Sequence, residues 1–344
     1  MRVLITGHLG YIGSVMAPMI RDAGHEITGL DSGYFADCTV ADVVAIPGLE
    51  TDLRDVTPED VAGFDAVVHL GGLSNDPLGS LNAELTYQIN FEAGLRLALA
   101  AKSAGVQRFL FASSCSMYGT AGDRAAGESS PLSPITPYAE SKVWFERALT
   151  ALADDDFSPV YLRNATAHGW SPRLRGDLVV HNLLGAALST GEVLIKSDGT
   201  PWRPLVHVED ISAAFVAALE APRQIIHDQA FNVGTNSENY QVSEIADLVA
   251  ATVPGSRVVY APGGEPDKRD YRVDFSFIED TLPGFHPKWT LEASVRDLHE
   301  RFIEHGVTLE VLESGTCTRL ARINDLVTSG NLDPELRWVG DAAQ

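Results

Sequence analysis

The stretch RVLITGHLGYIGSVMAPMIRDAGHEITGLD, residues 2–31, decides the fold of this chain. An apolar run typical of a β-strand, residues 2–6, leads into the glycine-rich turn GHLGYIG, residues 7–13. A helix is then predicted up to Gly24, followed by a second strand that ends at Asp31. The order strand, glycine turn, helix, strand, acid predicts a dinucleotide-binding βαβ unit.

Each glycine of the turn has a physical use in such a unit. Gly7 permits the tight turn, Gly10 lets a pyrophosphate approach the backbone, and Gly13 lets the helix pack closely on the strand. The helix N-terminus then faces the phosphates. Asp31 can accept hydrogen bonds from both ribose hydroxyls and would repel a 2′-phosphate, which favours NAD over NADP.

The alternation of strand and helix continues along the first half of the chain. It predicts an α/β fold, a doubly wound parallel sheet of the Rossmann type with helices on both faces. Further strands are expected at residues 65–72, 108–114 and 159–165, with helices at residues 86–105 and 138–153.

Polar and glycine residues stand where these strands end. In open α/β sheets, ligands bind at the carboxyl ends of the strands. We therefore expect one crevice to be lined by Gly7, Asp31, Gly71, Ser113 with Ser114, and the segment 164–166.

The segment PYAESK, residues 137–142, places Tyr138 and Lys142 four positions apart at the start of a predicted helix. Residues i and i+4 share one helix face, and a nearby ammonium lowers the pKa of a phenol. Such a pair can supply a base near neutral pH. Taken alone, the spacing is more typical of an ordinary surface pair, but its position just after a strand end favours a site.

The composition limits the class of partner. The chain has 344 residues, 45% of them hydrophobic, a formal net charge of −22 and a pI of about 4.7. It can bury a sizeable core, and its surface repels nucleic acid and anionic membranes. The three cysteines, Cys38, Cys115 and Cys317, form no C-x-x-C pair. We therefore expect no disulfide framework, no metal site and, because no leader or membrane span is evident, a cytoplasmic location.

At this level of detail the chain resembles the extended short-chain dehydrogenases/reductases, in the branch of NAD-dependent nucleotide-sugar epimerases and dehydratases. The resemblance runs from residue 1 to about residue 300. It is carried by the order and spacing of TGHLGYIG, LDSG, TDLRD, HLGGLS, FLFASSCSMYG, PYAESK, LRNATAHG, GTPWRPLVHVEDI, FNVG and DKRDYRVD.

The resemblance implies roles for individual residues. Tyr138 would be the general acid/base, Lys142 would lower its pKa and hold the nicotinamide ribose, and Ser114 would hydrogen-bond the sugar oxygen that is oxidised. The implied cofactor is NAD, bound by Gly7, Gly10, Tyr11, Ile12, Gly13, Asp31, Asp52, Leu53, Leu70, Gly71, Tyr138 and Lys142. The implied nucleotide-diphosphate sugar would be bound by Ser74, Ser114, Asn164, Asn182, Arg203 and Arg269.

The departures from the family pattern bear on the reaction. The 4,6-dehydratases of this family carry an Asp-Glu pair after the catalytic Ser/Thr, whereas Ser114 is followed here by Cys115 and Ser116. Loss of water needs an acid, so dehydration is disfavoured. The sequence favours an epimerase, acting at C4 through a transient 4-keto sugar. A 4-keto-sugar reductase that uses NAD(P)H and a non-catalytic NAD sensor stay open.

Three other residues invite chemical roles. Cys115 could be a nucleophile, but a small residue packed beside the cofactor is the better interpretation. His168 and His207 have no ligand-spaced partners, and structural or substrate-edge roles are favoured for them.

The expected organisation has three parts. Residues 1–170 form the NAD-binding domain with return segments near 205–235, residues 171–302 form a smaller mixed α/β substrate domain, and residues 303–344 form a C-terminal extension. The extension could cap the substrate cleft, contact a second subunit or pack on the surface. The resemblance also implies a homodimer formed by the helices at residues 87–104 and 138–153, although plain core packing explains their apolar faces as well.

Overall fold

A seven-stranded parallel sheet forms the centre of the molecule in the computed structural model, which describes residues 1–74, 76–79, 82–120, 124–263 and 270–340. The strand order is β10-β6-β5-β4-β1-β2-β3. These strands are β1 Arg2–Thr6, β2 Glu26–Asp31, β3 Gly48–Glu50, β4 Ala66–His69, β5 Arg108–Ser114, β6 Ser158–Asn164 and β10 Gln229–Val233. The predicted Rossmann-type sheet is confirmed.

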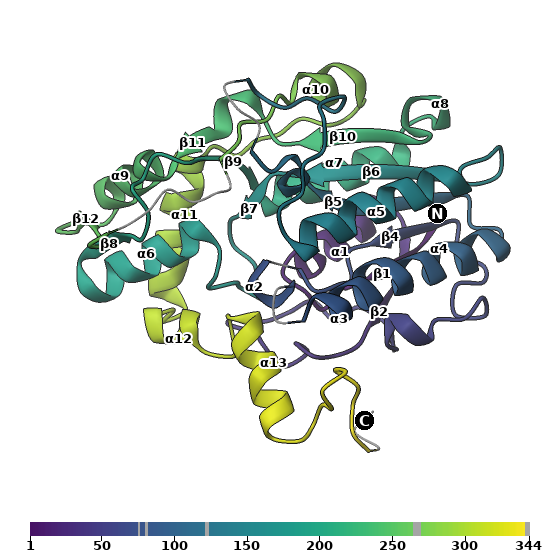
Figure 1. Ribbon diagram of the computed structural model, residues 1–344, viewed down its shortest axis with the longest axis horizontal. Helices are drawn as coiled ribbons and strands as arrows, with labels where there is room; N and C mark the ends of the chain where they lie inside the picture. The colour runs from purple at the N-terminus through teal and green to yellow at the C-terminus, as the bar shows by residue number, and fades with distance from the viewer. Residues whose placement is uncertain (75, 80–81, 121–123, 264–269, 341–344) are drawn as a thin grey trace.

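Helices cover both faces of this sheet (Figure 1). α1 (Gly13–Asp22) and α7 (Val208–Glu220) pack on one face, and α4 (Ala93–Ser103) and α5 (Pro137–Leu152) pack on the other. The side chains of β1 alternate between the two cores, because successive residues of a strand point to opposite faces. The strands are therefore buried on both faces, which explains their nearly continuous apolar sequences.

The predicted helix at residues 86–105 is built differently from the prediction. α3 (Ala83–Tyr87) continues into a π-helical turn, Gln88–Glu92, and only then into α4. Asn90 in this turn accepts a hydrogen bond from the Leu73 amide at 2.7 Å and donates one to the Leu73 carbonyl at 3.1 Å. The wide turn places the Asn90 side chain where it hydrogen-bonds the backbone of the loop after β4. The helical periodicity of the sequence did not reveal this turn.

A second, smaller part lies beside the sheet (Figure 1). It has a three-stranded sheet, β11-β9-β7, and a parallel pair, β12-β8, packed with three of its helices on a separate apolar core. Its strands are β7 Thr166–His168, β8 Glu192–Ile195, β9 Trp202–His207, β11 Asn239–Gln241 and β12 Arg257–Tyr260. The three helices are α6 Val179–Thr190, α9 Val242–Thr252 and α11 Leu291–Glu304.

The chain crosses between the two parts more than once. After β9 it returns to the large sheet as α7 and β10, so the core of the first part includes Phe215 and Phe231. The remaining helices are α2 Asp76–Gly79, α8 Arg223–Ile226, α10 Ser276–Thr281, α12 Leu309–Glu313 and α13 Arg319–Thr328. None of the described helices combines the length and the apolar character that a membrane crossing requires.

A buried ion pair ties α5 to the sheet. Arg163 on β6 donates from Nη2 to Oε2 of Glu146 at 2.6 Å and from Nε to Oε1 at 3.0 Å, and the two side chains are 8% and 7% exposed. Arg163 also donates to the Tyr118 hydroxyl and the Glu128 carbonyl. Since α5 carries Tyr138 and Lys142, this pair fixes the helix that begins at the site.

Removing one partner should leave the other charge buried and unpaired. We expect Arg163→Met to lower the free energy of unfolding by about 3–5 kcal/mol. The double variant Arg163→Met/Glu146→Leu should be less destabilised than Arg163→Met, because both charges are then gone. Urea unfolding followed by circular dichroism measures both values, and additive losses would contradict the coupling.

Candidate active site

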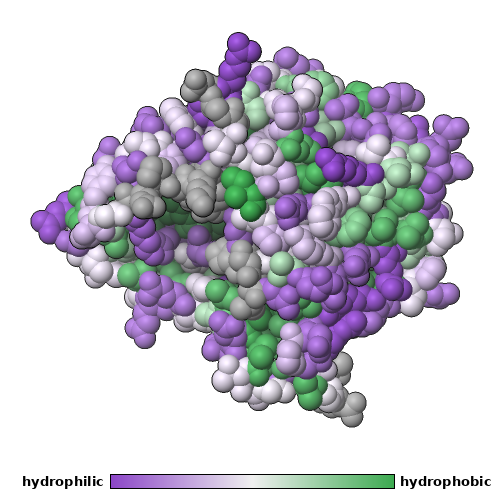
Figure 2. All heavy atoms as spheres, in the orientation of Figure 1, coloured by the Kyte–Doolittle hydropathy of each residue, from purple (hydrophilic) through white to green (hydrophobic). Residues whose placement is uncertain are grey.

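The carboxyl ends of the parallel strands open into one deep pocket. The strand-end residues that the sequence singled out all line it: Gly7, Asp31, Gly71, Ser113, Ser114, Asn164, Ala165 and Thr166. Figure 2 shows a hollow on this face of the molecule, between the region of α6 and the region of the central sheet. Parallel strands bring residues more than 150 positions apart to the same edge, so the pocket is a consequence of the sheet.

The glycine turn lets three backbone segments approach one another. Gly7 has φ +76°, and a Cβ atom there would lie 2.8 Å from the Gly71 nitrogen. A Cβ atom at Gly13 would lie 2.3 Å from the Gly7 carbonyl oxygen. The N-terminus of α1 therefore reaches the pocket with no side chain in between, as a bound phosphate requires.

Asp31 is held in place at the end of β2. Its carboxylate accepts hydrogen bonds from the amides of Leu9 at 3.1 Å and Gly33 at 3.0 Å. This leaves the carboxylate at the rim of the pocket, beside Gly7 and Gly10. The arrangement suits an acceptor for ribose hydroxyls.

Asp52 and Leu53 also line the pocket. They follow β3, at the edge of the sheet, and lie at the end away from the predicted catalytic residues. Asp52 accepts hydrogen bonds from Arg54 Nε at 2.9 Å and Nη2 at 2.6 Å. Burial raises the pKa of Asp52, but the hydrogen bonds from Arg54 outweigh burial and hold that pKa below its usual value. Asp52 is therefore a fixed negative charge at this end of the pocket.

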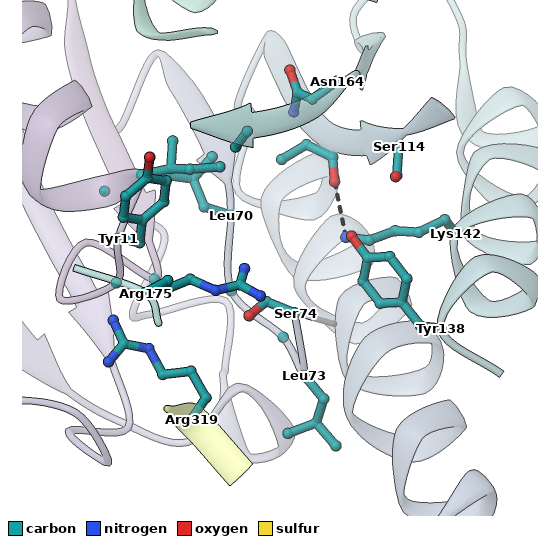
Figure 3. Close-up of a pocket in the computed structure, with 18 of the residues that line it drawn as sticks. Tyr11, Leu70, Leu73, Ser74, Ser114, Tyr138, Lys142, Asn164, Arg175 and Arg319 are labelled. Atoms are coloured by element: carbon teal, nitrogen blue, oxygen red, sulfur yellow. Dashed lines mark hydrogen bonds between the residues drawn. The ribbon is translucent and has the colours of Figure 1, made fainter. Parts of the chain in front are cut away.

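The predicted catalytic residues come together at the other end (Figure 3). Ser114 ends β5, and its hydroxyl caps the following turn by accepting from the Ser116 amide at 3.2 Å. Tyr138 opens α5, whose N-cap is the Thr136 hydroxyl. Lys142 Nζ donates to the Ala112 carbonyl at 2.8 Å and lies 5.5 Å from the centre of the Tyr138 ring.

The protonation of this pair differs from the expectation that Lys142 lowers the pKa of Tyr138. Burial raises the pKa of Tyr138 to about 12, with a further increase from the charge of Asp76, and the charge of Arg175 and the hydroxyl of Ser114 only partly oppose this. Burial also lowers the pKa of Lys142 to about 8. The ammonium is engaged by the Ala112 carbonyl and by aromatic ring faces, so desolvation outweighs its field at the phenol.

The structure separates the predicted substrate residues. Ser74, Asn164 and Arg203 line the pocket, whereas Asn182 on α6 is not among its described lining residues. Arg269 lies outside the described part of the chain. The roles assigned to these residues stay predictions.

Two arginines of the pocket were missed by the sequence reasoning. Arg175 lies in the segment between β7 and α6 and pairs with Asp177 through Nη2 and Oδ2 at 2.5 Å. Arg319 begins α13 in the C-terminal extension. Figure 3 shows both guanidinium groups on the same side of the pocket. Neither stands in a recognisable motif, so no local signal could have identified them.

Burial bears on the roles considered for Cys115, His168 and His207. Cys115 is fully buried and donates to the Arg163 carbonyl, and burial raises the pKa of its thiol, so it is packed rather than poised as a nucleophile. His168 contacts Ser294 at 2.8 Å, and burial lowers the pKa of His168 and of His207. Within the described residues, no group of three His, Cys, Asp or Glu side chains is placed to hold a metal ion.

Comparison with known proteins gives consistent matches. Residues 3–234 match the NAD dependent epimerase/dehydratase family. The UDP-glucose 4-epimerase of Mycolicibacterium smegmatis is 30% identical over 319 residues, which are 88% of this chain and 98% of that protein.

Two solved structures share the fold over nearly their whole length. MoeE5 in complex with UDP-glucose and NAD is 27% identical with a TM-score of 0.76, and the match covers 88% of this chain and 99% of that one. The NAD-dependent NDP-hexosamine 5,6-dehydratase TunA is 24% identical with a TM-score of 0.79, covering 88% and 98%, and at this identity it shows the fold alone.

The lowered pKa of Lys142 predicts a dependence of stability on pH. Between about 8, its pKa in the folded protein, and the ordinary value of 10.5, the unfolded chain binds a proton that the folded chain does not. Stability from this group therefore rises with pH across that window. Urea unfolding of the nucleotide-free protein at pH 7, 8, 9 and 10 should show wild type gaining stability relative to Lys142→Met above pH 8. A parallel course of the two proteins would contradict the assignment.

Proposed function

Because the chain belongs to the NAD-dependent epimerase/dehydratase family, we propose that it is a nucleotide-sugar epimerase that inverts C4 through a transient 4-keto sugar. The observation that carries the proposal is the grouping of Ser114, Tyr138 and Lys142 in the same pocket as the glycine turn and Asp31. The segment after Ser114 holds Cys115 and Ser116 and no carboxylate.

The pocket fits NAD, the cofactor of this family. The cradle of Gly7, Gly10 and Gly13 leaves room for a diphosphate, and the fixed carboxylate of Asp31 suits an unphosphorylated ribose. Asp52 and Leu53 would face the adenine, while Leu70 and Gly71 would line the opposite wall. When bound, oxidised NAD supplies a hydride acceptor and a positive charge at the catalytic end.

Tyr138 would exchange a proton with the sugar hydroxyl. Because burial keeps its phenol protonated in the free protein, the base forms only when added positive charge lowers its pKa. Ser114 would hold the sugar oxygen beside the phenol. Lys142 would hold the nicotinamide ribose, and its pKa of about 8 leaves most of it charged at neutral pH.

Epimerisation is favoured over dehydration by the surroundings of Ser114. The Cys115 thiol is fully buried, donates to the Arg163 carbonyl and is not among the described pocket lining, so it is not placed to protonate a leaving hydroxyl. Among described residues, the carboxylates of the pocket away from the adenine end are Asp76, which accepts from the Thr136 hydroxyl at 2.7 Å, and Asp177, which is paired with Arg175. Asp76 is the candidate acid if the protein proves to be a dehydratase.

The substrate proposed is a nucleotide diphosphate sugar. Arg203 and Arg175 bring guanidinium groups to the pocket, and guanidinium binds phosphate oxygens in bidentate fashion. Locally placed cations are needed because the net charge of −22 opposes an anionic ligand. The similarity to a UDP-glucose 4-epimerase makes a UDP-hexose the first substrate to test.

A cytoplasmic homodimer is proposed as the working form. Leu99 on α4 and Trp144 on α5 are 49% and 39% exposed, and Figure 2 shows apolar side chains gathered in the region of these helices. Such a patch suits contact with a second copy, although monomeric proteins also expose apolar patches of modest size. Light scattering on the eluting protein measures the oligomeric state.

Replacing the acid/base tests the proposal directly. We expect Tyr138→Phe to lower turnover by about 10²–10⁴-fold, because the proton of the sugar hydroxyl then has no acceptor. The control is Tyr87→Phe. It removes a phenol outside the described pocket lining that donates to Glu140, a residue of α5 like Tyr138. Near-normal turnover of Tyr138→Phe would overturn the assignment.

The reaction itself is identified with UDP-, dTDP-, GDP- and CDP-hexoses, with and without added NAD. Product identity is followed by NMR and reduced cofactor by absorbance at 340 nm. An isomer without net NADH supports the epimerase. Water loss that disappears in Asp76→Asn would indicate a dehydratase. Turnover only with a keto-sugar and a reduced cofactor would indicate a reductase, and NAD binding without turnover would indicate a sensor.

A further inference from the structure

The C-terminal segment, residues 319–340, packs against residues that line the pocket, and Figure 1 shows α13 as the yellow helix beside the central sheet. Ile323 and Leu326 of α13 join Leu332 and Leu336 in one apolar cluster with Leu73 and with residues of the α3 and π-helical turns.

Polar contacts fix the same segment to the loop after β2 and to the turn after Asp52. Arg322 Nη2 pairs with Asp37 at 2.7 Å and its Nε donates to the Tyr34 carbonyl at 3.2 Å. Trp338 Nε1 donates to the Ser32 carbonyl at 2.7 Å, and Arg54 Nη2 donates to the Leu336 carbonyl at 3.0 Å. The position of α13 beside the pocket is thus set by several independent contacts.

Arg319, the first residue of α13, enters the pocket itself. It is 2% exposed and stands among the lining residues. Its guanidinium lies 4.7 Å from the centre of the Phe35 ring and donates to the carbonyls of Arg173 at 3.0 Å and Thr316 at 3.4 Å. Figure 3 shows it on the side of the pocket that also holds Arg175.

This buried cation has no ion-pair partner in the described part of the chain. The nearby carboxylate of Asp177 is taken by Arg175. Burial lowers the pKa of Arg319 to about 10, and the charge of Arg175 adds to the effect. A buried charge is costly unless it is paired, so a bound anion next to Arg319 would offset the cost of burying its guanidinium.

The position of Arg319 selects the anion. Phe35, on which it stacks, follows Asp31 in the loop that closes the ribose end of the pocket, and the glycine turn with Tyr11 lines the same pocket. A diphosphate bound at the N-terminus of α1 carries two negative charges into this space. A planar guanidinium can meet two phosphate oxygens at once.

We propose that Arg319 is a ligand of the cofactor diphosphate, so that the C-terminal segment completes the NAD site from the side opposite the glycine turn. The inference rests on the NAD dependence of the family and not on the C4 chemistry proposed above. It gives the extension a specific binding role in place of the three general alternatives that the sequence left open.

Ligand affinity separates this role from a structural one. We would measure by calorimetry the binding of NAD⁺, ADP, adenosine and UDP to nucleotide-free wild type, Arg319→Met and Arg322→Met. Loss of a charged hydrogen-bond pair is worth about 1.5–3 kcal/mol, or about 10- to 140-fold in affinity. We expect Arg319→Met to lose this factor for NAD⁺ and ADP, with adenosine changed less than about twofold.

The matched control, Arg322→Met, removes a cation from the same helix that pairs with Asp37 outside the pocket lining. It should leave the ratio of ADP to adenosine affinity unchanged. Arg319→Lys keeps the charge but loses the planar fork, so its ADP affinity should lie between those of wild type and Arg319→Met.

Three results would overturn the proposal. Equal weakening of adenosine and ADP would mean that Arg319 only holds α13 in place. A loss confined to UDP would assign Arg319 to the substrate diphosphate, and unchanged affinities would leave it without a ligand. If Arg319→Met fails to fold, Arg319→Lys decides by the same ratio. None of these readouts depends on turnover, so a failed epimerase assignment and a failed Arg319 assignment are distinguishable.

Discussion

The close backbone approach of Gly7, Gly13 and Gly71 is the constraint on which the rest of the structure depends. Cβ atoms at the first two positions would lie 2.8 and 2.3 Å from backbone atoms of neighbouring segments. Only glycine allows β1, α1 and the end of β4 to meet at this distance. Their meeting brings the N-terminus of α1 to the edge of the sheet, where the other parallel strands also end.

The pKa values of Tyr138, Lys142 and Arg319 are governed more by desolvation than by pairwise charge. Lys142 lies beside Tyr138, yet burial raises the pKa of the phenol to about 12 and lowers that of the ammonium to about 8. The free protein therefore keeps Tyr138 in the phenol form. Arg319 follows the same rule, because burial lowers its pKa as well. A ligand with negative charge would offset the buried charge of Arg319, and a ligand with positive charge would lower the pKa of Tyr138.

The C-terminal segment contributes to a pocket that is built mainly by the first half of the chain. Its apolar residues cover Leu73 and the neighbouring helical turns, and its backbone carbonyls receive hydrogen bonds from Arg54. Arg54 in turn holds Asp52, which lines the pocket at the end proposed for the adenine. The segment thus connects mechanically to both the diphosphate and the adenine ends of the proposed NAD site.

The sequence by itself determined most of the local elements of the first half and the strand-end residues that share one pocket. Strand and helix periods fixed β1, β5 and α5 within a residue or so, because burial of one face or both imposes those periods locally. The parallel topology then required the strand-end residues to share one edge, which the pocket lining shows.

Only the tertiary structure decided which distant residues enter that pocket and how they ionise. Arg175 and Arg319 stand in no motif, Asn182 lies away from the described lining, and the π-helical turn at Asn90 interrupts an expected helix. Such positions depend on the path of the chain through loops, and pKa values depend on the burial that the whole fold creates. Neither quantity is encoded in a short window of sequence, since both arise from contacts between segments far apart in the chain.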